Sequence, residues 1–394
     1  MSDTGTAPVS EMDFVTDEVA QDPYPFYAEL RQQGPVVWLE QMNYYAVVSD
    51  QAVREALDQP LIFSSAKGIT QNSFLNEITG GRSTIATDPP QHQIVRSILG
   101  RPLRPRKLKE IEPWVREEAD ALILRLTARD TFDGMRDLAW HLPLSIVSHL
   151  VGLPEEGRER ILTWATAFIH AAGGENQRAQ EATPLMQEMF AWSAQNVTAD
   201  RVTPDGWAKQ IFDADERGEV PEGWAMNLIT DYIPPALDTT ISATGSLLMF
   251  LGEHPEQWDL LKRDPKLMPA ALGEALRLDP PLQGFSRYVT EDTSLQGTRI
   301  PAGSRVNLML GSANRDGERW DRPDEFDITR PDATQHLGFG FGEHVCIGQG
   351  LAKLEITSLL EAMIRHVDRI EIGVPQRKLV NGARLLERLP MSFS

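Results

Sequence analysis

A glycine-rich stretch around the only cysteine of the 394-residue chain decides the fold, and it reads Phe339-Gly340-Phe341-Gly342-Glu343-His344-Val345-Cys346-Ile347-Gly348. Cys346 precedes a helical pattern over Gln349–His366, whose N-terminal amides and positive dipole end favour a thiolate over a thiol. The flanking glycines let a bulky group approach the backbone closely. A solitary thiolate in this setting suits one axial metal ligand, because a disulfide needs a second cysteine and a structural zinc site needs four ligands.

The same stretch resembles the haem-ligand signature of the cytochrome P-450 family, F-G-x-G-x-H-x-C-x-G, at every fixed position. The resemblance implies a mainly α fold with a minor β region. In that fold, haem b (iron protoporphyrin IX) lies between a long distal helix and the helix that follows the axial cysteine. The resemblance also implies that Cys346 is the ligand of the iron, and that Phe339, Gly340 and Ala236 contact the haem.

Composition and charge narrow the class of protein. The chain is 41% hydrophobic and 24% charged, as in ordinary globular proteins. Its net charge of −19 argues against a nucleic-acid partner. No apolar run reaches the roughly 18 residues of a membrane span, and 1–22 lacks the basic and apolar regions of an export signal. We therefore expect a cytoplasmic protein without a membrane anchor, and the single cysteine fits that reducing compartment.

The pattern predicts one haem-thiolate domain over 1–394, with an N-terminal lobe that contains β-strands and a larger helical lobe. No linker-like segment divides the chain, which favours one domain over two, and we expect no fused reductase or ferredoxin module because few residues follow the cysteine helix. Strands are expected at 36–39, 44–48 and 287–307, a long loop at 63–87, and a terminal hairpin at 373–394. Helices are expected at 111–125, 142–151, 159–172, 183–195, 222–252, 255–263 and 267–278.

Weaker matches to the family follow in family order. Asp88-Pro89-Pro90-Gln91-His92 leads into Arg96, and a helix would place His92 and Arg96 on one face. Haem propionates are buried carboxylates that need cationic or hydrogen-bonding partners. The resemblance implies that His92, Arg96, Arg287 and His344 supply these contacts, although His92 and Arg96 would otherwise be interpreted as structural.

The pair Glu274 and Arg277 matches the E-x-x-R motif of the family. The pattern alone is uninformative, since 155–158 satisfies it too, but Glu274 lies in the predicted helix 267–278 just before the β region. We expect Glu274 and Arg277 to form a buried cluster with Arg330 that holds an irregular segment under the haem. Such a cluster is costly to break because a lone buried charge remains.

The stretch Pro234-Pro235-Ala236-Leu237-Asp238-Thr239-Thr240 resembles the oxygen-site motif [AG]-G-x-[DE]-T-T, with Ala236 at the usual glycine position. Oxygen chemistry on a haem requires a supply of protons. Thr239 fits a hydroxyl relay and Asp238 fits a carboxyl linked to solvent. Without Cys346, the same residues would be interpreted as part of an ordinary helix.

Pro234 and Pro235 depart from the family pattern, because they remove two helix N–H donors. We expect one helix to end near Ile233 and another to start after Pro235. The prolines would then free the carbonyls of Thr230 and Asp231. The hydroxyl of Thr239 is expected to reach the carbonyl of Pro235, four residues earlier.

The resemblance places a substrate pocket near these segments, and the side chains expected to line it are Phe74, Leu75, Ile85, Ile233, Leu282 and Phe285. Phrases such as Gly311-Ser312-Ala313-Asn314-Arg315-Asp316 resemble the bacterial branch that oxidises para-substituted benzoic acids. That branch holds the substrate carboxylate with arginine and serine, whereas Asp231 stands in the corresponding stretch here and would repel a carboxylate. A neutral aromatic, terpenoid or polyketide-like substrate is therefore at least as consistent with the sequence.

Three functional classes stay open. The first is a monooxygenase that uses O2 and a small, largely apolar substrate, with electrons from an acidic ferredoxin and its NAD(P)H-dependent reductase. The second is a haem-thiolate peroxygenase or oxidative coupling enzyme, and the third is a non-catalytic haem-binding sensor. The intact pair of Asp238 and Thr239 favours the first, because the other two classes do not require both residues.

One basic run stands out against the acidic background. It comprises Arg96, Arg101, Arg104, Arg106, Lys107 and Lys109. A run of this kind fits either a solvated helix end or a docking patch for an acidic protein. We expect it to face the ferredoxin on the cysteine side of the haem.

Overall fold

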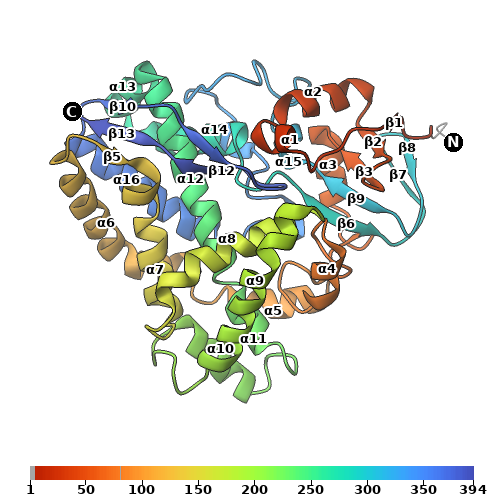
Figure 1. Cartoon of the computed structure of the whole chain (residues 1–394), viewed down its shortest axis with the longest axis horizontal. Coiled ribbons are helices and arrows are strands. Elements are labelled where there is room, and N and C mark those ends of the chain that lie inside the picture. Colours follow the sequence, from red (N-terminus) through yellow and green to blue (C-terminus); the bar gives the residue numbers. More distant parts are fainter. Residues whose placement is uncertain (1–4, 80) are drawn as a thin grey trace.

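The computed structural model describes residues 5–79 and 81–394, which form a mainly helical body with a β-rich region on one side (Figure 1). The helices of the first half are α1 (Asp17–Gln21), α2 (Tyr24–Gln33), α3 (Asp50–Leu57), α4 (Ser73–Thr79), α5 (Gln91–Leu99), α6 (Pro105–Thr127), α7 (His141–Val151), α8 (Ile161–Ala172) and α9 (Gln177–Asn196). Those of the second half are α10 (Trp207–Glu216), α11 (Ala225–Thr230), α12 (Pro234–Glu253), α13 (Pro255–Arg263), α14 (Met268–Leu278), α15 (Leu310–Ala313) and α16 (Gln349–His366). Short 3₁₀ or π turns are η1 (Gly134–Ala139), η2 (Arg158–Arg160), η3 (Pro265–Leu267), η4 (Ala333–Gln335) and η5 (Gly342–His344).

The strands form one larger sheet and three smaller ones. The larger sheet has the order β1-β2-β3-β9-β6-β4, from β1 (Val9–Ser10), β2 (Val36–Leu39), β3 (Tyr44–Val47), β9 (Arg305–Leu308), β6 (Phe285–Val289) and β4 (Phe63–Ser64). The remaining strands are β5 (Phe132–Asp133), β7 (Thr293–Leu295), β8 (Thr298–Ile300), β10 (Ile370–Ile372), β11 (Gln376–Lys378), β12 (Leu385–Arg388) and β13 (Pro390–Phe393). The predicted hairpin is confirmed, since β2 pairs antiparallel with β3 and Val36 lies opposite Val47.

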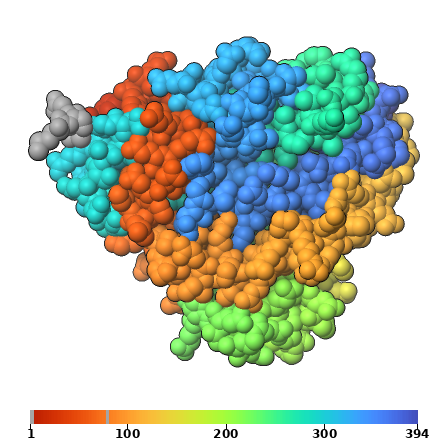
Figure 2. Space-filling model, turned by 180° about the vertical axis from the view of Figure 1, so that it is seen from behind, coloured from red at the N-terminus to blue at the C-terminus, as the bar shows by residue number. Residues whose placement is uncertain are grey.

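α12 passes through the middle of the helical region, where it contacts α7, α8, α14 and α16 (Figure 1). Most of its side chains are buried, which follows from a sequence that is apolar or small on every face. α6 packs along α16, and the two lie next to each other on the face seen in Figure 2, where ochre meets blue. Within the described residues, no helix is both long and apolar enough to cross a bilayer.

Several predicted boundaries need correction. α6 and α9 begin at Pro105 and Gln177, before the predicted starts at 111 and 183. Proline is well tolerated at a first helical position, and Asn176 caps α9 by accepting the N–H of Ala179. The predicted loop 63–87 contains α4. At the C-terminus, β11 pairs with β12, whereas β13 joins β10 and β5 instead of completing a simple hairpin.

The predicted helix 222–252 is two helices, as the prolines implied. α11 ends at Thr230 and α12 begins at Pro234 itself, because a proline at the first helical position has no N–H that needs a partner. The carbonyl of Thr230 was expected to be free, but it accepts the N–H of Ile233 at 2.9 Å. The break is therefore a tight turn at 231–233.

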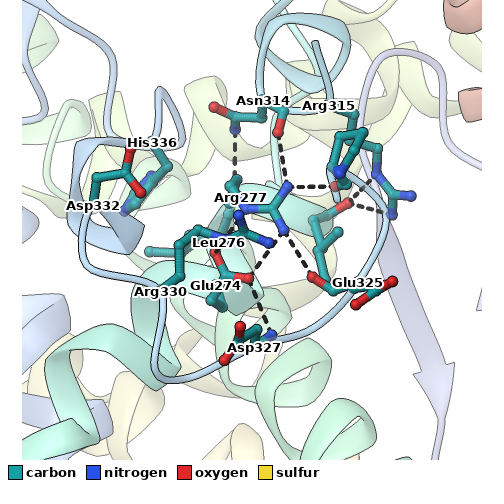
Figure 3. Close-up of polar contacts among 12 residues, drawn as sticks. Glu274, Leu276, Arg277, Asn314, Arg315, Glu325, Asp327, Arg330, Asp332 and His336 are labelled. Carbon is teal, nitrogen blue, oxygen red and sulfur yellow. Dashed lines mark hydrogen bonds and ion pairs between the residues drawn. The ribbon is translucent and has the colours of Figure 1, made fainter. Parts of the chain in front are cut away.

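Glu274 lies on α14, fully buried between two arginines (Figure 3). Its Oε1 accepts the Nε–H of Arg277 at 2.7 Å and the Nε–H of Arg330 at 3.0 Å, and its Oε2 accepts a second bond from Arg277 at 3.0 Å and the N–H of Asp327 at 3.2 Å. The expected contact of Glu274 with both arginines is thus present. Arg277 also donates to the carbonyls of Asn314, Pro323 and Glu325, which lie in irregular chain.

We expect Glu274→Gln to lower the free energy of unfolding by about 3–5 kcal/mol, because two buried arginines lose their shared charge partner. The measurement is chemical unfolding of the haem-loaded protein, followed by circular dichroism. Glu371→Gln, at an exposed pair with Arg369 on β10, is the control and should leave the unfolding midpoint unchanged. Equal effects of the two substitutions would contradict the role of the cluster.

Candidate functional site

A cavity lies between α12 and α16. On the α12 side it is lined by Pro235, Ala236, Thr239, Thr240 and Ala243, and on the α16 side by Leu351, Ala352, Glu355 and Ile356. Most of the segment from Gly338 to Gly348 also lines it, together with Thr84, Ile85, Leu282, Phe285 and Arg287. The long helix and the helix after the cysteine therefore face each other across one space.

Cys346 lines this cavity and lies three residues before Gln349, the first residue of α16. Its N–H donates to the carbonyl of Phe339 at 2.7 Å, and Gly340 adopts a φ of 73°, so the chain turns back on itself around the cysteine. Burial raises the pKa of the thiol, although the N–H groups of Gly348 and Gln349 and the charge of Arg96 oppose this. The helix end thus acts in the predicted direction, but it does not outweigh desolvation; a coordinated metal ion would deprotonate the thiol outright.

Three of the four residues expected at the propionates, Arg96, Arg287 and His344, line the cavity, and the fourth, His92, packs against His344. Arg287 is buried, and its guanidinium donates to the carbonyl of Ser286 at 2.8 Å but forms no ion pair with any described residue. Burial lowers its pKa to about 10, so it stays charged at neutral pH. His92 is also buried, with Nδ1 3.0 Å from Glu343 Oε1 and Nε2 unpartnered among the described residues. Arg287 therefore carries a charge that no ion pair with a described residue balances, and Nε2 of His92 has no hydrogen-bond partner among the described residues.

His344 and Arg96 complete this group. The ring of His344 lies 4.2 Å from that of His92, and burial lowers its pKa to about 3, so it is neutral at physiological pH. Arg96 donates to the carbonyl of Val345 at 2.6 Å, which ties α5 to the cysteine loop. A buried guanidinium without an ion pair and a thiol line one largely apolar cavity, and the unpartnered imidazole nitrogen of His92 belongs to a ring next to His344 in its wall. This set fits a flat apolar group that carries carboxylates and an iron.

Asp238 and Thr239 are neighbours that point in different directions, as expected for residues about 100° apart around a helix. Thr239 lines the cavity, and its hydroxyl donates to the carbonyl of Pro235 at 2.6 Å, as predicted. Asp238 is buried against α8, where its Oδ1 accepts the hydroxyl of Thr166 at 3.0 Å and its Oδ2 has no described partner. Burial raises the pKa of Asp238 to about 6, despite the Thr166 hydrogen bond and the nearby charge of Lys378.

Three of the six predicted pocket residues line the cavity, namely Ile85, Leu282 and Phe285. Phe74 does not line it and is 47% exposed. Leu75 packs with Ala171 and Met186 in a separate cluster, and Ile233 belongs to the main core. These three positions correct the prediction, because α4 and the turn at 231–233 direct them away from the cavity.

Two residues at the site were not identified from the sequence. Thr166 holds Asp238 from α8, which is too far along the chain for any local pattern to reveal it. Glu355 lines the cavity from α16; it is buried, its Oε2 has no described partner, and burial raises its pKa well above the usual range. Glu355 could have been recognised from the sequence, because it is a carboxylate on the helix face that also carries the apolar residues Leu351 and Leu359.

The comparisons with known proteins agree with this geometry. The cytochrome P450 family model matches residues 225–371, from α11 to β10. Cytochrome p450 CYP199A2 from Rhodopseudomonas palustris is 36% identical over 95% of this chain and 91% of its own length. Linalool 8-monooxygenase from Pseudomonas putida is 29% identical over 91% of this chain and 92% of its own. The solved structure of CYP109E1 from Bacillus megaterium with testosterone has a TM-score of 0.86 and 25% identity, and the match covers 96% of this chain and 100% of that one.

The cysteine loop, the opposed helices and these matches define a haem-dependent oxidoreductase that acts with O2. The chain belongs to the cytochrome P450 family and is a monooxygenase of that family. The predicted family and fold class are thereby confirmed.

Proposed function

We propose that this P450 inserts one oxygen atom from O2 into a small, largely apolar organic substrate, by hydroxylation or O-demethylation, with electrons from a ferredoxin and its reductase. The observation that carries the proposal is the intact acid–alcohol pair, in which Thr239 lines the cavity and Asp238 is held by Thr166. A peroxygenase, a coupling enzyme or a sensor would need no such pair. The single cysteine supports a cytoplasmic location, since a reducing compartment disfavours disulfides.

In this proposal the chain is one haem-thiolate domain, and the cavity holds haem b. Cys346 would ligate the iron, Phe339, Gly340 and Ala236 would contact the ring, and His92, Arg96, Arg287 and His344 would bind the propionates. When bound, the haem would supply oxygen binding and redox chemistry. The protein residues would exclude water with their apolar walls and move protons through the Thr239 hydroxyl and the Asp238 carboxyl.

Cys346→Ser tests the ligand. The wild-type protein, reduced and exposed to carbon monoxide, should show the red-shifted Soret band typical of thiolate ligation, and the variant should lose it. Thermal unfolding of the variant serves as the control for folding. A variant that keeps the band would show that another residue binds the iron.

Thr239→Ala and Asp238→Asn test proton delivery. Thr239→Ala should still bind substrate but convert most reducing equivalents into hydrogen peroxide instead of product. Asp238→Asn should lower turnover by about 10²-fold, since an amide cannot pass protons. Because the pKa of Asp238 is raised to about 6, its protonated fraction falls as the pH rises from 5 to 8.

The rate of product formation by the wild-type protein should therefore decline as the pH rises through about 6, and the Asp238→Asn variant should show no such decline. Turnover and peroxide are measured together at each pH. Substrate affinity, read from the spin-state change, should stay the same in all three proteins. An unchanged product yield in Thr239→Ala would exclude its hydroxyl from the relay.

The basic run forms a smaller surface than the sequence suggested. Arg96 points into the site, Arg101 pairs with Glu219, and Lys107 pairs with Glu110 at 2.8 Å. Arg104 and Lys109 are exposed at the start of α6 and make no ion pair with any described residue. Since α6 packs along α16, this free charge lies on the side of the molecule that carries the helix after the cysteine (Figure 2).

The double variant Arg104→Glu/Lys109→Glu should lower the association rate with an acidic ferredoxin by about tenfold at low salt and flatten its salt dependence. Stopped-flow reduction measures this rate. The control is Arg263→Glu/Lys266→Glu, which changes the net charge equally at exposed positions of α13 and η3. Peroxide-driven turnover should be the same in both variants. Equal loss of association in both variants would mean that the start of α6 is not the docking surface.

A further inference from the structure

A carboxylate at the helix break points to the kind of substrate that the cavity accepts. Asp231 follows α11 directly, and its backbone N–H bonds the carbonyls of Asn227 and Ile229. Because Pro234 and Pro235 prevent the helix from continuing, Asp231 lies at a turn instead of inside a helix. Its side chain reaches the wall of the cavity together with Thr84, which arrives from the loop before α5.

Asp231, which is half-buried, lacks the ion pairs that two of the fully buried acids have. Asp279 is bound by Arg377 and Arg384, and Glu274 is bound by two arginines, whereas Asp231 makes no ion pair with any described residue. Burial raises the pKa of Asp231 to about 7, and only hydrogen bonds from Thr84 oppose this. A buried carboxylate without a cation is costly unless a donor satisfies it.

One carboxyl oxygen has such a donor, since Oδ2 accepts the N–H of Thr84 at 2.7 Å. The Thr84 hydroxyl lies near enough to favour the charged acid, but its geometry falls short of a hydrogen bond, and among the described residues it has no partner. Asp231 and Thr84 thus present an acceptor and an unused hydroxyl to the cavity. The same cavity is also lined by the largely apolar side chains of Ile85, Leu99, Leu103, Trp207 and Tyr232. The Tyr232 hydroxyl does not compete, because it donates to the carbonyl of Leu99 at 2.6 Å.

The pair also lies apart from the expected oxygen site. Asp231 lies in the turn before α12, whereas Thr239 lies more than one turn into α12, and both line the cavity. A substrate anchored at Asp231 would therefore present its opposite end to Thr239.

We propose that Asp231 and Thr84 form a polar subsite that selects substrates with a hydrogen-bond donor, an amine or a hydroxyl, at the end remote from the oxidised carbon, and that disfavours carboxylates. This proposal rests on the proposed function. Asp231 could instead serve only to hold the loop at Thr84, and the variant Asp231→Asn separates this structural role from substrate selection. In that variant the amide oxygen still accepts the Thr84 N–H, but the negative charge is lost.

The test is a spin-state titration of the haem-loaded protein with four ligands that share a methoxyphenyl ring and differ only in the group para to the methoxy group. They are para-methoxybenzylamine, para-methoxybenzyl alcohol, para-methoxybenzoate and para-methoxytoluene. The wild-type protein should bind the amine or the alcohol at least about tenfold more tightly than the benzoate. Comparison of the amine with the alcohol separates an ion pair from a neutral hydrogen bond.

Asp231→Asn should reduce this preference to less than about threefold, mainly because the benzoate binds better once the like charge is gone. The affinity for para-methoxytoluene should not change. The control Asp215→Asn removes one exposed carboxylate from α10 and should keep the wild-type preference. A wild-type protein that binds benzoate as well as the amine and the alcohol, or an Asp231→Asn variant with unchanged preference, would overturn the proposal.

Failure of the subsite is distinguishable from failure of the proposed function. The reduced carbon monoxide band and the yield of hydroxylated or demethylated product depend on Cys346 and Thr239. If both readouts are normal while the preference among the four ligands is absent, only the assignment of Asp231 is wrong.

Discussion

Glu274 is a carboxylate buried between two arginines, and the position of the cysteine loop depends on it. The chain between α15 and the loop is irregular and cannot satisfy its buried backbone groups with sheet or helix bonds. Arg277 and Arg330 supply the missing donors to carbonyls of that segment, and Glu274 holds both guanidinium groups in place (Figure 3). Asn314 then accepts the N–H of Leu337 at 2.7 Å, immediately before the glycines that lead to Cys346.

The cluster of Glu274, Arg277 and Arg330 fixes the geometry of the irregular segment more than it raises the stability of the fold. A buried ion cluster contributes little net stability compared with well-packed apolar residues, since desolvation offsets much of the attraction. What the cluster provides is a set of fixed hydrogen-bond directions in a region where the backbone has no regular pattern of its own. A packed apolar core could fill the same volume, but it could not bond the carbonyls of Asn314 and Glu325.

Local patterns in the sequence were sufficient for much of the fold. The β2–β3 hairpin, α13, α16 and the interruption before α12 all follow from alternation, helical spacing or proline chemistry within a few residues. The charge cluster and the proximity of His92, Arg96 and His344 to the cysteine loop could be predicted from family motifs. Phe74 and Leu75 were misplaced because their orientation depends on α4, which packs against distant helices. Thr166 could not be found at all, since its contact with Asp238 joins α8 to α12 across 72 residues of chain.

The two prolines at the start of α12 also affect the hydration of the cavity wall. A helix ordinarily begins with four N–H groups that lack intrahelical partners and that attract water or anions. Here the first two positions have no N–H, and the third, Ala236, bonds the carbonyl of Ile233 at 3.2 Å. The end of this helix can thus face an apolar space with almost no dehydration penalty. The prolines thus remove the donors with which a helix start would usually bind solvent.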